Sequence, residues 1–204
     1  MSGRRLWGCH RLDPYWARQI VATAAIRPGE LVVDLGAGTG ALTLPLVKAG
    51  ARVIAVELHA GRARQLRATL NGYAASVVEC DLEDFAPPGQ PFRLVANPPY
   101  ALTAAVLSFV ARSSHLSGAD LVLPRAVVRR VVDQGRGDLR RFHARRGLPI
   151  PRSAFLPPSP VDSAVLKSAD SEGRGITRPR MPLELTGVVC GGRRSRHRPS
   201  VLQR

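Results

Sequence analysis

The sequence contains few residues of several kinds, and each scarcity narrows the classes of protein that it can encode. Its 3 cysteines, Cys9, Cys80 and Cys190, show neither a pairing pattern nor a C-x-x-C spacing, which argues against a disulfide framework and a zinc site. No apolar stretch approaches the roughly 20 residues that a membrane-spanning helix needs. The basic segment 1–11 is not followed by the apolar core of a secretory signal. We therefore expect a soluble protein that holds no metal, does not contact a membrane and is found in the reducing cytoplasm.

Acidic residues are also scarce relative to basic ones. The chain has 15 aspartates and glutamates against 30 lysines and arginines, which gives a net charge of +15 and a pI near 11.5. This balance favours a polyanionic partner, with nucleic acid as the first candidate. Lys48 and Lys167 are the only lysines, so arginine carries nearly all of the positive charge. Arginine suits bidentate contacts to phosphate, although a GC-rich genome would favour the same composition.

The length and the hydrophobic pattern predict one α/β domain with a short appendage. A chain of 204 residues is long enough for one domain of ordinary size and too short for two full domains. Buried-type strands alternate with helices, which predicts a doubly wound, mostly parallel sheet covered by helices on both faces. The predicted strands are 31–35, 52–56, 76–79, 92–96 and 120–123, and the predicted helices are 13–26, 41–49, 61–70, 103–112 and 125–132.

Two basic regions lack this alternation. We expect region 135–152 to form a loop and an RNA-facing surface, because it combines arginines and histidines with few apolar residues. Apolar periodicity ends at Ser168, so we predict a domain over 1–167 and a weakly ordered basic tail over 168–204. The tail either binds RNA phosphates and becomes ordered on binding, or is a dispensable solvated extension.

The segment 33–40 (VDLGAGTG) joins a predicted strand to a predicted helix through three glycines. Glycines at such a turn let the backbone approach a ligand and present helix N-terminal amides to it. The spacing G-x-G-x-G differs from the G-x-G-x-x-G that fits a dinucleotide pyrophosphate. A tight structural turn is the alternative to a nucleoside site. The site hypothesis predicts ligand contacts at Asp34, Gly36, Gly38 and Gly40.

Two carboxylates follow the next two predicted strands. Glu57 lies about twenty residues after the glycine loop, where this fold directs an acid to ribose hydroxyls. Asp81 can accept a hydrogen bond from the amino group of an adenine ring. Taken singly, Glu57 could be a surface residue and Asp81 a helix N-cap. Because ligands of this fold bind along the carboxyl ends of the strands, we expect both acids and the glycine loop to form one site.

The segment 97–100 (NPPY) directly follows another predicted strand. An amine conjugated to a purine ring is a poor nucleophile, so it needs acceptors for its hydrogens while the nitrogen faces an electrophile. We predict that the Asn97 side-chain oxygen and the Pro98 carbonyl are these acceptors, and that Tyr100 stacks on a flipped base. A plain Asn-Pro turn with a packed tyrosine is the alternative.

Taken in order, these motifs resemble the rRNA adenine N6-dimethyltransferase family. The resemblance covers roughly 4–167, from a first motif at 7–12 (WGCHRL) to a final block at 155–163 (FLPPSPVDS). It implies a Rossmann-like class I S-adenosylmethionine-dependent methyltransferase fold, methyl transfer to N6 of an adenine in RNA, and Phe155 opposite Tyr100 across the target base. The cofactor contacts that it implies are His10, Leu12, Gly36, Glu57, Asp81 and Asn97.

Within that family, the arginine-rich start and the forms of the first and last motifs resemble actinobacterial Erm proteins. These enzymes methylate an adenine of 23S rRNA and thereby confer resistance to macrolide, lincosamide and streptogramin B antibiotics. We expect this activity in a monomeric chain. A 16S rRNA dimethyladenosine transferase remains an alternative, as does an adenine-specific DNA methyltransferase, because Pro98 stands where these RNA enzymes commonly have isoleucine or leucine.

The chain also departs from the family pattern. Cys9 and Arg11 replace the usual glutamine and phenylalanine, and the helical C-terminal domain that normally follows the final block is expected to be reduced or absent. These departures keep open a non-catalytic RNA-binding assembly factor. For an active enzyme, the arginines of 125–146 are the main candidates for RNA contact.

Overall fold

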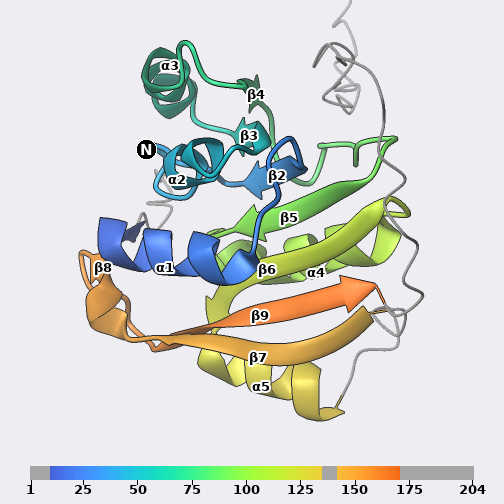
Figure 1. Cartoon of the computed structure of the whole chain (residues 1–204). Helices are drawn as coiled ribbons and strands as arrows, with labels where there is room; N and C mark the ends of the chain where they lie inside the picture. The colour runs from blue at the N-terminus through green and yellow to red at the C-terminus, as the bar shows by residue number, and fades with distance from the viewer. Residues whose placement is uncertain (1–9, 135–141, 171–204) are drawn as a thin grey trace, which may run out of the picture.

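The computed structural model describes residues 10–134 and 142–170, which form an α/β domain (Figure 1). In chain order the elements are β1 (Arg11–Leu12), α1 (Pro14–Ala24), β2 (Leu31–Leu35), α2 (Thr43–Lys48), β3 (Arg52–Glu57), α3 (Ala60–Thr69), β4 (Ala75–Glu79), β5 (Phe92–Ala96), η1 (Tyr100–Leu102), α4 (Thr103–Arg112), β6 (Leu116–Pro124), α5 (Arg125–Gln134), β7 (Phe142–Ile150), η3 (Arg152–Ala154), β8 (Phe155–Leu156) and β9 (Ser163–Asp170).

A seven-stranded sheet forms the centre of the domain, in the order β4-β3-β2-β5-β6-β9-β7. The strands from β4 to β6 run parallel, whereas β9 is antiparallel to both β6 and β7. After β4 the chain returns past β3 and β2, so that β5 pairs with the free edge of β2. The predicted doubly wound, mostly parallel α/β fold is confirmed.

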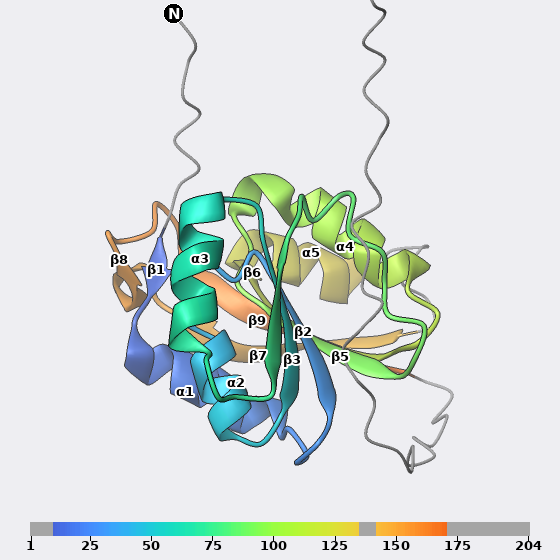
Figure 2. The same cartoon turned by 90° about the horizontal axis from the view of Figure 1, so that it is seen from above.

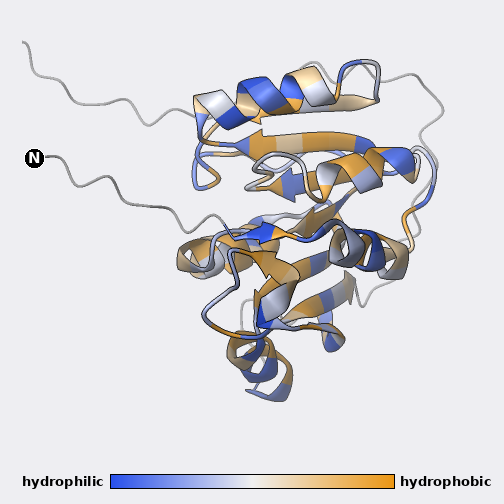
Figure 3. Ribbon diagram, turned by 90° about the vertical axis from the view of Figure 1, so that its left-hand side faces the viewer, coloured by the Kyte–Doolittle hydropathy of each residue, from blue (hydrophilic) through white to orange (hydrophobic). Residues whose placement is uncertain are grey.

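Helices cover both faces of this sheet because successive strand residues point to opposite sides. On one face α1, α2 and α3 pack against Val32, Val53 and Val95, and on the other α4 and α5 pack against Val33 and Leu94. Figure 2 shows the two groups of helices on either side of the strands. Apolar residues gather in the strands, and polar residues lie on the outer faces of the helices (Figure 3). Burial on both faces explains why the central strands are continuous apolar runs.

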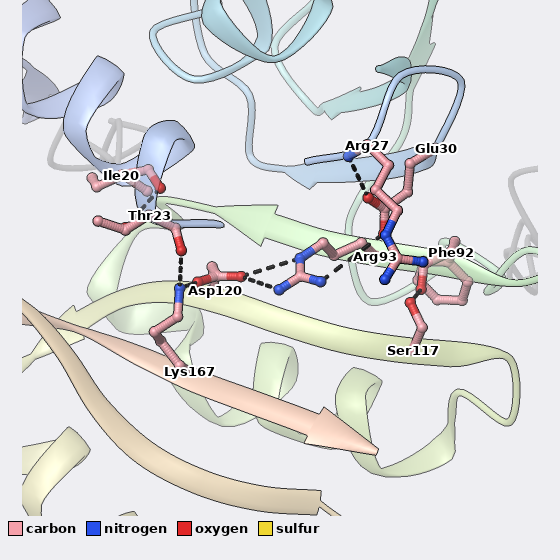
Figure 4. Close-up of polar contacts among 9 residues, drawn as sticks. All are labelled: Ile20, Thr23, Arg27, Glu30, Phe92, Arg93, Ser117, Asp120 and Lys167. Atoms are coloured by element: carbon pink, nitrogen blue, oxygen red, sulfur yellow. Dashed lines mark hydrogen bonds and ion pairs between the residues drawn. The ribbon is translucent and has the colours of Figure 1, made fainter. Parts of the chain in front are cut away.

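A buried charged cluster joins strands β5, β6 and β9 to the end of α1 (Figure 4). Asp120 is fully buried and accepts hydrogen bonds from the Arg93 guanidinium, at 3.2 Å from Nε and 3.0 Å from Nη2, and from Lys167 Nζ. Lys167 also donates to the Thr23 carbonyl at 2.8 Å, and Arg93 lies 4.0 Å from the Glu30 carboxylate. We name these four charged residues the Asp120 cluster. It ties the antiparallel strand β9 to the parallel part of the sheet.

One expectation from the sequence is wrong: region 135–152 is not a loop throughout, because 142–150 forms strand β7. Strand β9 continues to Asp170, past the expected domain end at 167. Strand β7 lies at the edge of the sheet, where charged residues are common. Because of its arginines, its sequence lacks the apolar run that marks the central strands. Strand β6 also starts at Leu116, earlier than expected. Residues 171–204, the rest of the predicted tail, lie outside the described residues.

Across 10–134 and 142–170, no helix is long and apolar enough to cross a membrane.

Candidate functional site

A cavity of about 620 Å³ opens at the carboxyl edge of the parallel strands. Its size is that of a site for a small molecule or cofactor. Every site residue predicted from the sequence lines it except Gly40. The predicted residues at the cavity are His10, Leu12, Asp34, Gly36, Gly38, Glu57, Asp81, Asn97, Pro98, Tyr100 and Phe155.

The three glycines of the loop after β2 serve different purposes. Gly38 has φ +59 and open space where a Cβ would lie, so the backbone there can approach a ligand. Gly36 has φ +74, and a Cβ would meet Pro99 at 3.3 Å, so this glycine lets the loop contact the 97–100 turn. Gly40 has φ +92, and its Cβ would lie 2.6 Å from Leu66 of α3. Gly40 is therefore required for packing, which explains its absence from the cavity wall.

Glu57, the last residue of β3, is buried at the cavity wall and organises its surroundings. Its carboxylate accepts hydrogen bonds from the backbone amides of Gly38 at 2.9 Å and His59 at 2.8 Å. The Arg62 guanidinium pairs with the same carboxylate at 2.8 Å. Glu57 thus holds both the glycine loop and the start of α3. A ribose hydroxyl bound here would donate a hydrogen bond to the same carboxylate, in addition to the donors that it already has.

Asp34 lies in β2 beneath the glycine loop and is 1% exposed. The Thr43 hydroxyl donates to its Oδ2 at 2.7 Å. The pKa of the Asp34 carboxyl is raised from 3.8 to about 7, mainly by burial; the hydrogen bonds from Thr43 oppose this rise, and the negative charge of Glu57 adds to it. Asp34 therefore titrates near neutral pH at the floor of the cavity.

Asp81 follows β4 and is half-buried at the cavity. Its Oδ1 accepts the backbone amide of Glu83 at 3.0 Å, which shapes the turn that carries it. Neighbouring Cys80 is disulfide-bonded, contrary to the expectation of no disulfide framework, and Cys9 and Cys190 lie outside the described residues. The other Asp81 carboxylate oxygen is the candidate acceptor for a ligand amino group.

The 97–100 turn directly follows β5 and opens on the same cavity. Asn97 is half-buried, Pro98 is buried, and Tyr100 begins the short helix η1. The Tyr100 hydroxyl lies 2.5 Å from Ser163 Oγ and 3.1 Å from Ser159 Oγ. The turn is therefore bonded to the final sequence block as well as packed against the glycine loop.

The first and last motifs meet in a two-stranded sheet of β1 and β8, in which Leu12 pairs with Phe155. His10 Nδ1 lies 3.0 Å from the Pro157 carbonyl oxygen, which extends this contact. Phe155 lines the cavity but is only 3% exposed, whereas Leu156 beside it is 63% exposed. The expectation that Phe155 flanks a target base stays a prediction. In this structure its ring belongs to the core. Residues 7–9 of the first motif lie outside the described residues.

Several functional candidates escaped the sequence analysis. Arg62 and His59 line the cavity from the start of α3, where His59 Nδ1 caps the helix by accepting the Gly61 amide at 3.1 Å. Ser159 and Ser163 lie far from Tyr100 in sequence, so only the fold reveals their contacts. Helical spacing could not have revealed Arg62, because Glu57 lies on β3 and Arg62 on α3. In the described part of the chain, no group of three or more His, Cys, Asp or Glu residues could hold a metal ion.

Comparison with known proteins agrees with this geometry. A family model described as ribosomal RNA adenine dimethylase matches residues 11–169. A ribosomal RNA small subunit methyltransferase A from Cupriavidus taiwanensis is 30% identical over 177 residues, covering 80% of this chain and 64% of that protein. An rRNA adenine N-6-methyltransferase from Corynebacterium diphtheriae is 30% identical over 159 residues, covering 75% of this chain and 61% of that protein.

Among solved structures, the 23S rRNA methyltransferase ErmE has a TM-score of 0.72 and 27% identity, over 78% of this chain and 68% of that one. Magnesium protoporphyrin IX methyltransferase from Synechocystis with bound SAM shares the fold, with a TM-score of 0.54 and 20% identity. The chain spans 64% of the length of the Cupriavidus relative and 61% of the Corynebacterium relative. The family match itself extends from β1 into β9, across nearly all of the described domain. This chain belongs to the ribosomal RNA adenine dimethylase family.

Proposed function

We propose that the chain transfers a methyl group from S-adenosylmethionine to N6 of an adenine in ribosomal RNA. The observation that carries this proposal is the shared cavity: the Asn97-Pro98 turn, the glycine loop and Glu57 all line it. The turn and the loop also touch, since a Cβ at Gly36 would meet Pro99 at 3.3 Å. A cofactor lying along the loop would therefore end close to an amine held by the turn.

The residues of the cavity fit S-adenosylmethionine. Gly38 leaves open space for a ligand at the glycine loop, Glu57 offers a carboxylate for ribose hydroxyls, and Asp81 offers one for an adenine amino group. A volume of about 620 Å³ accommodates a nucleoside with an amino-acid tail. When bound, the cofactor supplies an electrophilic methyl group on its sulfonium centre.

The chain's own residues would hold and orient the amine. The Asn97 side-chain oxygen and the Pro98 carbonyl accept its two hydrogens, which keeps the nitrogen lone pair directed toward the methyl group. The ring of Tyr100 supplies a flat apolar face for a base taken out of its stack. None of these steps requires a covalent intermediate with the protein.

Within ribosomal RNA, we propose 23S rRNA as the substrate, with antibiotic resistance as the consequence and the cytoplasm as the place of action. The structural likeness to ErmE and the forms of the first and last motifs support this choice. Methylation of 16S rRNA is the second candidate, because the relative from Cupriavidus taiwanensis is a small subunit methyltransferase. Exposed arginines of α5, which begins beside the site, offer phosphate contacts to either RNA.

The test is methyl transfer from labelled S-adenosylmethionine to separate 23S rRNA, 16S rRNA, DNA and protein, followed by mapping of the modified nucleotide. We expect label on one adenine of 23S rRNA. Asn97→Ala should lower kcat by about 100-fold or more, since it removes an acceptor aimed at the reacting amine. Asn71→Ala, at an exposed asparagine, is the matched control and should retain activity. Transfer to 16S rRNA alone would select the second candidate, and equal activity in Asn97→Ala would reject the mechanism.

A further inference from the structure

The hydroxyl of Tyr100 is enclosed by two serines from the final sequence block. Ser159 is 3% exposed and Ser163 is 1% exposed, and their Oγ atoms lie 3.1 Å and 2.5 Å from the tyrosine oxygen. Ser159 Oγ also lies 2.9 Å from the Val161 carbonyl oxygen. The two serines come from different places, one from the loop after β8 and the other from the first residue of β9.

The protons of these hydroxyls can be assigned by counting donors. A carbonyl oxygen only accepts, so the single proton of Ser159 is directed to Val161. Ser159 Oγ must then accept from Tyr100, which uses the tyrosine's only proton. Ser163 therefore donates to the tyrosine oxygen. The hydrogen bonds run in one direction, from Ser163 through Tyr100 and Ser159 to the Val161 carbonyl.

The segment that carries the two serines is itself fixed at several points. The Ser159 amide donates to the Arg152 carbonyl at 3.0 Å, and the Arg152 amide donates to Asp162 Oδ1 at 3.0 Å. The Asp162 carbonyl accepts the amide of Arg125 at 2.9 Å, which ties the segment to the start of α5. The serines therefore give Tyr100 a stationary anchor.

We propose that Ser159 and Ser163 are positioning residues, which hold the Tyr100 ring at the angle needed to stack on the target adenine. This inference rests on the proposed function and extends it. Because the tyrosine hydroxyl is occupied by the serines, only its ring remains for the cavity that Tyr100 lines. A ring attached at its Cβ alone could swing about the Cα–Cβ bond, whereas one also held at the hydroxyl keeps its long axis in one direction. The serines thus act on the base through the tyrosine, without touching the base.

The test measures kcat, the KM for RNA and the Kd for S-adenosylmethionine in the full chain carrying Tyr100→Phe, Ser163→Ala or both. Tyr100→Phe keeps the aromatic face and removes only the anchor. We expect each single change to lower kcat about tenfold, because small misplacements of reacting groups slow catalysis strongly. The Kd for S-adenosylmethionine should stay within about twofold, and the double variant should be no slower than Tyr100→Phe, as for two partners of one contact.

Ser153→Ala, at an exposed serine of η3, is the matched control and should leave all three constants unchanged. Tyr100→Phe with wild-type kcat would overturn the positioning role, even if its unfolding free energy falls, because a contact needed only for stability does not alter turnover of the folded enzyme. Independent effects that multiply in the double variant would also overturn it. Absence of methyl transfer by the unaltered chain to any RNA would instead reject the proposed function and this inference with it.

Discussion

Two charged clusters of this domain differ in how completely the protein pairs them. In the Asp120 cluster, a fully buried carboxylate receives Arg93 and Lys167, and Lys167 also donates to a backbone carbonyl. In the carboxyl-edge cavity, Asp34 receives a hydroxyl from Thr43 but no cationic side chain from the described residues 10–134 and 142–170, and its pKa is raised to about 7, mainly by burial. Removing one partner from a fully paired buried charge cluster destabilises a fold, whereas an acid with a strongly shifted pKa in a cavity is a candidate for chemistry or binding.

Glu57 lies between these two extremes. It is paired with Arg62, yet it also holds the backbone of the glycine loop and faces the cavity. Changes in the Asp120 cluster should affect the stability of the fold, and changes at the cavity should affect ligand binding or protonation.

The largest expected effect is on stability. Asp120→Ala removes the carboxylate shared by the nearly buried Lys167 and the half-buried Arg93, so we expect the free energy of unfolding to fall by about 3–5 kcal/mol. Chemical denaturation followed by circular dichroism measures this loss. Asp133→Ala is the control, because Asp133 pairs with Arg146 on the surface and should contribute less than about 1 kcal/mol. Equal effects from the two variants would show that the Asp120 cluster is not what stabilises the join between β6 and β9.

Next in size is an effect on the cofactor. Glu57→Gln removes the charge that binds the Gly38 amide and that we propose as the acceptor for ribose hydroxyls, so we expect the Kd for S-adenosylmethionine to rise about 10- to 100-fold. Titration calorimetry measures this change. Glu79→Gln is the matched control, since Glu79 ends the neighbouring strand opposite Glu57 but is exposed. An unchanged Kd in Glu57→Gln would contradict a cofactor role for this carboxylate.

The parallel part of the sheet and the cavity at its carboxyl edge were predicted well from the sequence, for a physical reason. Central parallel strands are buried on both faces, so they appear as short apolar runs, and their carboxyl ends must meet at one edge. Knowing where β2, β3 and β5 end was therefore enough to bring Asp34, Glu57 and Asn97 together.

The antiparallel strands and the contacts of the final sequence block were harder to predict, because they depend on residues that are far apart in the sequence. Strand β7 is an edge strand with exposed Arg145 and Arg146, and its antiparallel pairing with β9 depends on residues 13 to 28 positions away. The serine anchor of Tyr100 joins residues that are 59 and 63 positions apart. Gly40 matched the motif but serves α3 packing, which spacing alone cannot distinguish from ligand contact.

Asp34 predicts an effect on stability that depends on pH. Its folded-state pKa of about 7 lies above the ordinary value of 3.8, so between these values the folded chain holds a proton that the unfolded chain has released. Stability therefore falls as pH rises through this window, by at most about 1.4 kcal/mol per pH unit, and levels off above about pH 7. Asp34→Asn has no carboxyl that titrates at this position. The stability of the variant relative to the wild type should increase with pH across that window.

Urea unfolding of both proteins at several pH values measures the difference, in which the contributions of all other titrating groups cancel. A difference that stays constant from about pH 4 to about pH 7 would mean that Asp34 is ionised throughout, with its charge stabilised despite burial. Asp34 would then resemble Asp120, and the contrast between the two clusters would be lost.

The smallest expected effect concerns RNA. Arg129 and Arg130 are exposed on α5, away from both clusters, so replacing both by alanine should leave stability and the Kd for S-adenosylmethionine unchanged. If they contact phosphates, RNA affinity should fall several-fold, and the slope of log affinity against log salt should decrease by about 1 for each lost contact. Filter binding between about 50 and 200 mM salt measures that slope. Arg64 and Arg67 are exposed on α3, on the opposite face of the sheet, and their double replacement is the matched control. An equal loss of slope in both double variants would mean that RNA binding follows the overall charge of +15, not a surface at α5.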